Sequence, residues 1–189
     1  MHTKVSLIIA FLGLISTSVF AQLEIGASYE LRDEEPQSGF GVRIEKGFLE
    51  QVPLVGLSMR AHFSFFSDKN DVSENGISYS QELTNYDFGA AIIAGMSIGL
   101  IEPYIGFGLG STSLEIQRKD FVSIPQGFEQ EQDASESNIY FNGIIGSKVT
   151  IIPLIKPFIE YRYSNSSLTE PEVAELTTGR IIFGVSLSF

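Results

Sequence analysis

The chain has 189 residues, no cysteine and a formal net charge of −11 at pH 7. This length suits one domain, the lack of cysteine excludes a disulfide framework and a lipid-anchored cysteine, and the acidity argues against nucleic acid or anionic headgroups as partners. No segment after the first 21 residues approaches 18 consecutive apolar residues, which excludes a helical membrane span.

The first 21 residues have the pattern of a secretory signal peptide. His2 and Lys4 precede an apolar run over 5–14, and small residues follow at 16–21. This order predicts export and cleavage, leaving a domain of 22–189. That domain carries 23 acidic and 11 basic residues, a formal charge of about −12. The alternative, a buried N-terminal helix, lacks a comparable apolar helix to pack against.

Apolar and polar side chains alternate with a period of two through the exported domain, which predicts strands. The alternation is clear near the end of the chain, where every second residue from Ile181 to Phe189 is apolar. The predicted strands are 22–31, 39–48, 54–67, 83–96, 104–113, 137–149, a seventh containing Ile159, Tyr161 and Tyr163, and 180–189. In the sixth, either Ile139, Phe141 and Ile145 face outward or a bulge near Gly143 changes the register. In the fifth, Gly106, Gly108 and Gly110 predict a crowded interior or a bend.

The connections between these strands are of two kinds that alternate along the chain. Short turns containing proline alternate with polar loops at 32–38, 68–82, 115–136 and 165–175. The four loops together hold 16 acidic and 4 basic residues. The fold class predicted from this order is all-β, an eight-stranded antiparallel up-and-down transmembrane β-barrel with its long loops at one end.

Alternation alone does not say which face of the barrel points inward. A soluble lipocalin-like carrier would fill its interior with the apolar face. A membrane barrel would instead enclose charges that can pair: Glu24, Glu30, Glu45, Asp87 and Glu160 with Arg43, Arg60, Lys148, Arg162 and Arg180. Aromatic residues near strand ends suit interfacial belts: Tyr29, Tyr104, Tyr161, Tyr163 and Phe48.

Three motifs and the terminal phenylalanine carry a family resemblance. They are Pro103-Tyr-Ile-Gly-Phe-Gly-Leu-Gly110, Lys156-Pro-Phe-Ile-Glu-Tyr-Arg-Tyr163 and Gly179-Arg-Ile-Ile-Phe-Gly184. The chain resembles the small eight-stranded outer-membrane β-barrel domain family of Gram-negative bacteria. The resemblance implies a location in the cell outer membrane, a narrow interior, contact with outer-membrane lipids and lipopolysaccharide, recognition of the chain end by the barrel assembly machinery, and a monomer.

The function predicted from these features is a non-enzymatic role in envelope structure or surface interaction, based on acidic surface loops. We expect no catalytic residues, no cofactor and no bound metal. A divalent cation held by Asp68, Asp71 and Glu74 is a weaker alternative, because the segment lacks the glycine and the distal glutamate of a calcium loop.

An outer-membrane enzyme acting on lipid is the alternative function. Arg162-Tyr-Ser-Asn165 resembles the catalytic His-x-Ser-Asn segment of lipid A deacylases. Arg162 replaces the histidine, and a guanidinium that stays charged cannot act as general base toward Ser164. His62 and Ser64 share a face of the third strand, where an interior polar pair is the favoured interpretation.

Overall fold

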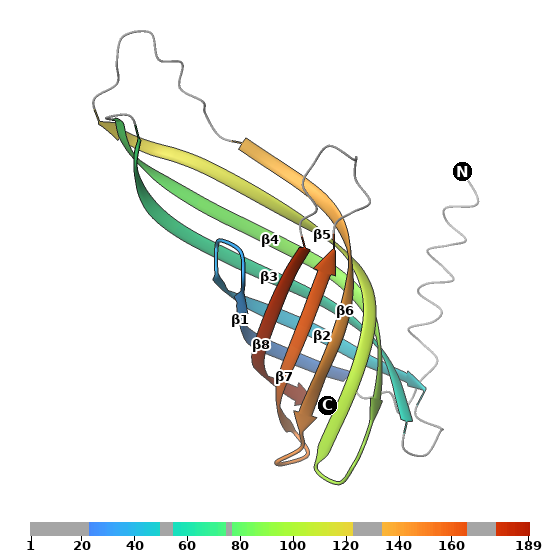
Figure 1. Ribbon diagram of the computed structural model, residues 1–189. Coiled ribbons are helices and arrows are strands. Elements are labelled where there is room, and N and C mark those ends of the chain that lie inside the picture. Colours follow the sequence, from blue (N-terminus) through green and yellow to red (C-terminus); the bar gives the residue numbers. More distant parts are fainter. Residues whose placement is uncertain (1–22, 50–54, 75–76, 123–133, 166–176) are drawn as a thin grey trace, which may run out of the picture.

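The computed structural model describes residues 23–49, 55–74, 77–122, 134–165 and 177–189, which form a closed barrel of eight antiparallel strands (Figure 1). The strands are β1 (Leu23–Arg32), β2 (Ser38–Leu49), β3 (Val55–Glu74), β4 (Ile77–Met96), β5 (Ile101–Val122), β6 (Ala134–Val149), β7 (Ile155–Asn165) and β8 (Thr177–Ser188). Each strand pairs with its neighbours in chain order. The predicted fold class is confirmed. The predicted signal peptide lies outside the described residues.

Pairing of β1 with β8 closes the ring. The backbone N–H of Leu23 donates to the carbonyl of Phe189 with an N···O distance of 3.3 Å, and the reverse bond measures 2.9 Å. The register continues to the pair Arg32 and Arg180 at the other end of β1. A closed ring leaves no unpaired backbone within its wall, as a strand surrounded by hydrocarbon requires. Among the described residues, no helix is long and apolar enough to cross a membrane.

Short turns lie at the end of the barrel that holds Phe189, which we call the turn end (Figure 1). Between β4 and β5, Ile98 and Ile101 exchange backbone hydrogen bonds of 2.8 and 3.2 Å around Gly99. Gly99 has a φ of 63°, which suits glycine in a tight hairpin. The opposite end, where Asp33–Gln37 connects β1 to β2, is called the loop end.

Four strands continue beyond the ring at the loop end as a projecting sheet, formed by 67–74, 77–85, 111–122 and 134–140 (Figure 1). β2 stops pairing with β3 at Phe66, and β7 stops pairing with β6 at Phe141. Beyond these points β3, β4, β5 and β6 pair only among themselves. The prediction of loops is therefore wrong for 68–74, 77–82, 115–122 and 134–136, which are strand, while residues 75–76 and 123–133 lie outside the described part.

The ring is apolar outside and ionic inside. Phe107 on the outer face of β5 is 62% exposed, whereas Arg60 and Asp87 on inward positions are 1% and 0% exposed. This order is the reverse of a soluble barrel and matches a strand wall in lipid. The lipocalin-like alternative requires an apolar interior and does not fit.

The polarity of the outer face switches where the projecting sheet begins. Along β3 it changes from Phe65 to Ser67, and along β5 from Leu109 to Ser111. The inner face of the sheet carries apolar side chains in the same region: Phe66, Val72, Tyr79, Leu83, Leu114 and Ile116. The switch marks the loop-end border of the apolar belt.

The sixth strand is regular. Its register with β5 is unbroken from Val149 to Ala134. Ile139, Phe141 and Ile145 are all exposed on the outer face. The first of the two predicted arrangements is confirmed, and no bulge occurs at Gly143.

Aromatic residues gather on the outer face near the loop end. The Tyr29 and Phe40 rings lie 5.5 Å apart, as do the Phe65 and Tyr86 rings, and the register pairs Phe40 with Phe65. Phe48, Tyr161 and Tyr163 are likewise exposed, as predicted for belts. The prediction was wrong for Tyr104, which is 4% exposed and points inward. Its register partner Gly146 leaves room there, because a Cβ on Gly146 would collide with the Tyr104 ring.

Candidate functional site

The barrel interior holds two networks of ion pairs, one around Glu160 and one around Asp87, and these contain the candidate functional side chains. Near the turn end, Glu24 accepts from Lys148 at 2.7 Å and from Lys156 at 2.9 Å. Lys148 also donates to Glu45 at 2.9 Å, and Glu45 accepts from Arg60 at 2.8 and 2.9 Å. These side chains come from five strands and tie opposite sides of the ring together.

Glu160 is the centre of the network in the middle of the barrel. It is 1% exposed and accepts a hydrogen bond from the Tyr104 hydroxyl at 2.8 Å. Arg60 and Arg43 reach its Oε2, the latter at 3.4 Å. Arg162 donates to its Oε1 at 2.9 Å. One carboxylate thus neutralises parts of three guanidiniums, which is the compensation that burial of charge requires.

Asp87 is the corresponding centre nearer the loop end. It accepts from Arg180 and from the Tyr140 hydroxyl, each at 2.7 Å, and is 0% exposed. The His62 ring nitrogen Nε2 lies 3.5 Å from Asp87 and 3.2 Å from the Tyr140 hydroxyl. Glu30 completes the group 3.6 Å from Arg180.

All ten ionic residues predicted to face inward are buried, so this prediction is confirmed. Sequence reasoning missed Lys156, a sixth buried cation, and the two inward tyrosines Tyr104 and Tyr140. The sequence did contain a signal for Lys156: it lies an even number of residues before Glu160 and Arg162 on the same strand and therefore shares their inward face. Its place next to Pro157 favoured an interpretation as a turn.

The alternate glycines of β5 make room for this network. A Cβ on Gly110 would collide with the Tyr140 ring, and one on Gly108 would collide with the Ala90 carbonyl oxygen. Gly106 is similarly close to Ile93. The prediction of a crowded interior is confirmed for this strand.

Cavities lie among the interior side chains toward both ends of the described barrel. One of about 180 Å³ lies at the turn end and is lined by Glu24, Glu45, Lys148 and Lys156. The other, of about 70 Å³, is lined near the loop end by Tyr140, Ser164 and Arg180. Side chains occupy the space between them, in agreement with the narrow interior expected of eight strands.

The structure does not assemble the catalytic groups that the sequence suggested. Ser164 is 4% exposed, its hydroxyl has no hydrogen-bond partner, and it lies inside the barrel with Arg162. Ser64 donates to Glu30 at 2.9 Å, while His62 contacts Tyr140. No hydrogen bond joins a serine to His62 among the described residues.

The structure also gives no support to a divalent cation bound by Asp68 and Asp71. Asp68 and Asp71 are three residues apart on β3, so their side chains leave opposite faces of the strand. Within the described ranges, no group of three or more His, Cys, Asp or Glu side chains is placed to hold a metal ion.

Comparison with known proteins identifies the fold. No protein-family model matches the chain, and no curated protein sequence matches it. Among solved structures it is similar to Neisserial surface protein A, with 18% identity and a TM-score of 0.57 over 89% of this chain and 97% of that one. The N-terminal β-barrel domain of Pseudomonas aeruginosa OprF matches over the same shares, with 14% identity and a TM-score of 0.55. A major outer membrane protein of Thermus thermophilus matches over 90% of this chain and 100% of that one, with 10% identity and a TM-score of 0.60.

The fold is that of the small eight-stranded outer-membrane β-barrels. The resemblance stated from the sequence motifs is confirmed at this level. The exposed apolar outer face and the buried charges of the ring agree with the predicted location in a membrane. At this identity the likeness shows the fold and says nothing about activity.

Proposed function

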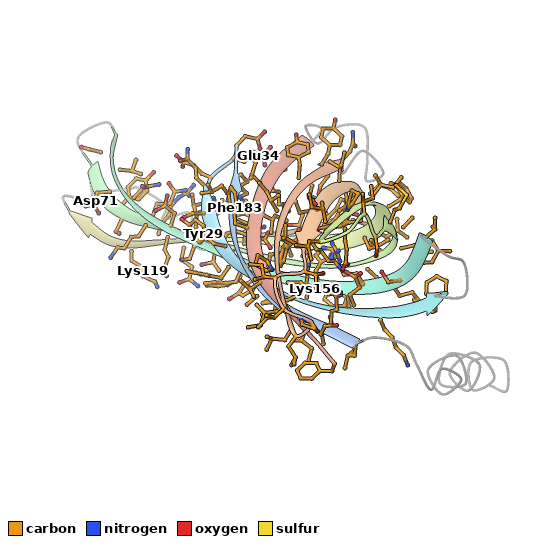
Figure 2. All side chains as sticks on the ribbon, turned by 90° about the horizontal axis from the view of Figure 1, so that it is seen from below. Tyr29, Glu34, Asp71, Lys119, Lys156 and Phe183 are labelled. Atoms are coloured by element: carbon orange, nitrogen blue, oxygen red, sulfur yellow. The ribbon has the colours of Figure 1, made fainter. Side chains whose placement is uncertain are left out.

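We propose that this chain is a non-enzymatic, monomeric outer-membrane protein whose projecting sheet forms an interaction surface outside the cell. The observation that carries the proposal is the sheet itself. Four strands continue past the apolar belt, and along β3, β4 and β5 the outer face turns from apolar to hydroxylated and charged at the border. Asp71 and Lys119 lie on the projecting part, far from Lys156 in the ring (Figure 2). A sheet of this extent exceeds what closing a barrel requires.

The β6 edge of the projecting sheet is its best candidate contact. Residues 134–140 pair with β5 on one side, and no described strand pairs with them on the other. Their sequence, Ala134-Ser-Glu-Ser-Asn-Ile-Tyr140, has a single charge. The β3 edge instead carries the charged residues Asp68, Lys69 and Asp71. Charges on an edge strand discourage pairing with a strand of another chain. An extended segment of a partner could add to the β6 edge through backbone hydrogen bonds.

The proposed orientation follows from the usual arrangement of such barrels. Their short turns and chain ends lie in the periplasm and their long connections lie outside. The turn end with Phe189 would then face the periplasm after removal of residues 1–21, and the barrel assembly machinery would recognise the terminal strand. The projecting sheet would face the exterior.

Trimming the sheet tests the proposal. Residues 112–138 are replaced by Asn-Gly, which joins Ser111 to Ile139, a pair already in register, and removes most of the β6 edge. Cells lacking the protein are complemented with the full or the trimmed chain, and surface attachment and detergent sensitivity are compared. We expect both chains to assemble as heat-modifiable barrels and only the full chain to restore attachment. Restoration of attachment by the trimmed chain would contradict the interaction role, and rescue of detergent resistance alone would favour an envelope-structural role.

The lipid A deacylase alternative has its own test. Purified protein is incubated with lipopolysaccharide, and released fatty acid is measured for the unchanged chain and for Ser164→Ala and His62→Ala. We expect no release from any of the three. Release that either substitution abolishes would overturn the non-enzymatic assignment.

A further inference from the structure

The fully buried ionisable side chains of the described barrel do not balance. They comprise five carboxylates (Glu24, Glu30, Glu45, Asp87, Glu160) and six cations (Arg43, Arg60, Lys148, Lys156, Arg162, Arg180). Half-buried Arg32, Glu34 and Glu102 add one positive and two negative charges, and Glu34 accepts a hydrogen bond from Thr178 at 3.0 Å. The fully buried side chains alone therefore carry one positive charge more than their own carboxylates neutralise.

The surplus lies at Arg162. This side chain is 2% exposed, and its single ion pair runs from Nη2 to Glu160, a carboxylate that Arg60 and Arg43 already share. Its Nε and Nη1 have no hydrogen-bond partner. Buried donors are almost always satisfied, so two unpartnered nitrogens on one guanidinium indicate a missing acceptor.

A second buried arginine adjoins Arg162 on the neighbouring strand. Arg162 and Arg180 are directly opposite in the β7–β8 register, and both point inward. Arg180 binds Asp87 through Nη2, but its Nε has no partner and its Nη1 is 3.6 Å from Glu30. Like charges in directly opposed positions destabilise a strand pair, and a negative charge between them would reverse that effect.

Two neutral donors adjoin the arginines. Ser164 lies two residues beyond Arg162 on the same face of β7, and its register partner on β6 is Asn142. They are 4% and 1% exposed, and neither the Ser164 hydroxyl nor the Asn142 amide has a hydrogen-bond partner. Ser164 and Arg180 line the 70 Å³ cavity near the loop end.

We propose that Arg162, Arg180, Ser164 and Asn142 bind one small monovalent anion, of the size of chloride, inside the barrel. A monovalent ion matches the single surplus charge of the fully buried side chains. Of the four residues, Ser164 and Arg180 line the small cavity, which excludes large anions. Glu34 and Glu35 in the same lining oppose the binding of any anion, and of a multiply charged one most strongly. Bound there, the anion accepts hydrogen bonds from the unpartnered donors and separates the two guanidiniums.

A chloride titration of the full chain, folded in detergent, tests the proposal. Sodium chloride replaces sodium gluconate at constant ionic strength, and the midpoint of thermal unfolding is followed by gel mobility. We expect the midpoint to rise and saturate with chloride, because a ligand that binds only the folded state stabilises it. Ser164→Ala should weaken the apparent affinity by about tenfold, the effect of one lost hydrogen bond to a charged ligand.

The decisive variant is Arg162→Met, matched by Arg43→Met. Both remove one buried guanidinium from Glu160, but Arg43 satisfies its nitrogens with Ser186, Tyr104 and Glu160. Arg162→Met should lose the chloride dependence, and Arg43→Met should keep it. Equal dependence in both variants, or no dependence in the unchanged chain, would overturn the proposal.

Crystals grown in sodium bromide give a readout that does not depend on how the variants fold. We expect an anomalous peak within hydrogen-bond distance of Ser164 Oγ and an Arg162 nitrogen. Water alone at these atoms would refute the site.

Discussion

Replacement of Glu160 by glutamine should destabilise the barrel more than replacement of any exposed carboxylate. Glutamine keeps the shape of the side chain and removes its charge. Glu160 accepts from four donors, and hydrogen bonds to charged groups contribute roughly 1.5–3 kcal/mol each, so a simple sum would be about 6–12 kcal/mol. The arrangement of the donors reduces this figure.

Two of the three arginines keep other partners when Glu160 loses its charge. Arg60 retains Glu45 at 2.8 Å, and Arg43 retains Ser186 at 2.9 Å and the Phe158 ring at 3.3 Å. Only Arg162 loses its single ion pair. We therefore expect a loss of about 3–5 kcal/mol, the typical cost of leaving one buried charge unpaired.

The control is Glu82→Gln on the projecting sheet. Glu82 pairs with Lys119 at 3.3 Å, and both side chains are exposed, so the expected loss is about 0–1 kcal/mol. Urea unfolding in lipid vesicles is followed by far-ultraviolet circular dichroism, because the chain has no tryptophan. Adding Arg162→Met to Glu160→Gln should recover part of the lost stability. Equal losses in Glu160→Gln and Glu82→Gln would refute the reasoning, because they would mean that water screens the interior charges.

Two further predictions each compare a disruptive substitution with a control position on the same strand or a neighbouring strand. Phe107→Arg should cost about 2–4 kcal/mol of unfolding free energy if the residue lies near the bilayer midplane. Ser113→Arg, beyond the polarity switch on the same face of β5, should cost less than about 0.5 kcal/mol. Equal costs in vesicle unfolding would place the border of the apolar belt elsewhere. Gly110→Val should lower the free energy of unfolding by about 1–3 kcal/mol or prevent folding, because its Cβ would collide with Tyr140. Gly143→Val should be tolerated, because Gly143 has open space on the outer face. A heat-modifiability gel distinguishes these outcomes, and a stable Gly110→Val barrel would contradict the packing described.

The ring of the barrel was predictable because lipid imposes a strict alternation on its strands. Outward positions must be apolar, and inward positions in a narrow interior must be small or paired, so parity alone placed Glu30, Asp87 and Arg180 correctly. The prediction failed for Tyr104 because a tyrosine side chain suits both an interfacial belt and an interior hydrogen bond. Its position could be recognised only from the space left by Gly146.

The projecting sheet was not predictable from the same signal. Outside lipid, neither face of a strand has to be apolar, and the faces exchange polarity at Phe65 and Ser67. A pattern that reverses phase resembles the end of a strand followed by a polar loop. The unpartnered atoms of Arg162 and Ser164 were equally hidden, because strand parity shows which side chains face inward and not which of them meet a partner.

Spin labels placed one at a time along β5 test the central claim most directly, that the ring carries its apolar face to lipid and its charges inside. The absence of cysteine allows single-cysteine variants without background. In the folded protein in vesicles, labels at Ile105, Phe107 and Leu109 should be accessible to oxygen dissolved in the lipid, and labels at Ser111 and Ser113 should be accessible to a water-soluble nickel reagent. High nickel accessibility at Ile105, Phe107 and Leu109 would show that water covers this face, and the account of a membrane barrel would be wrong.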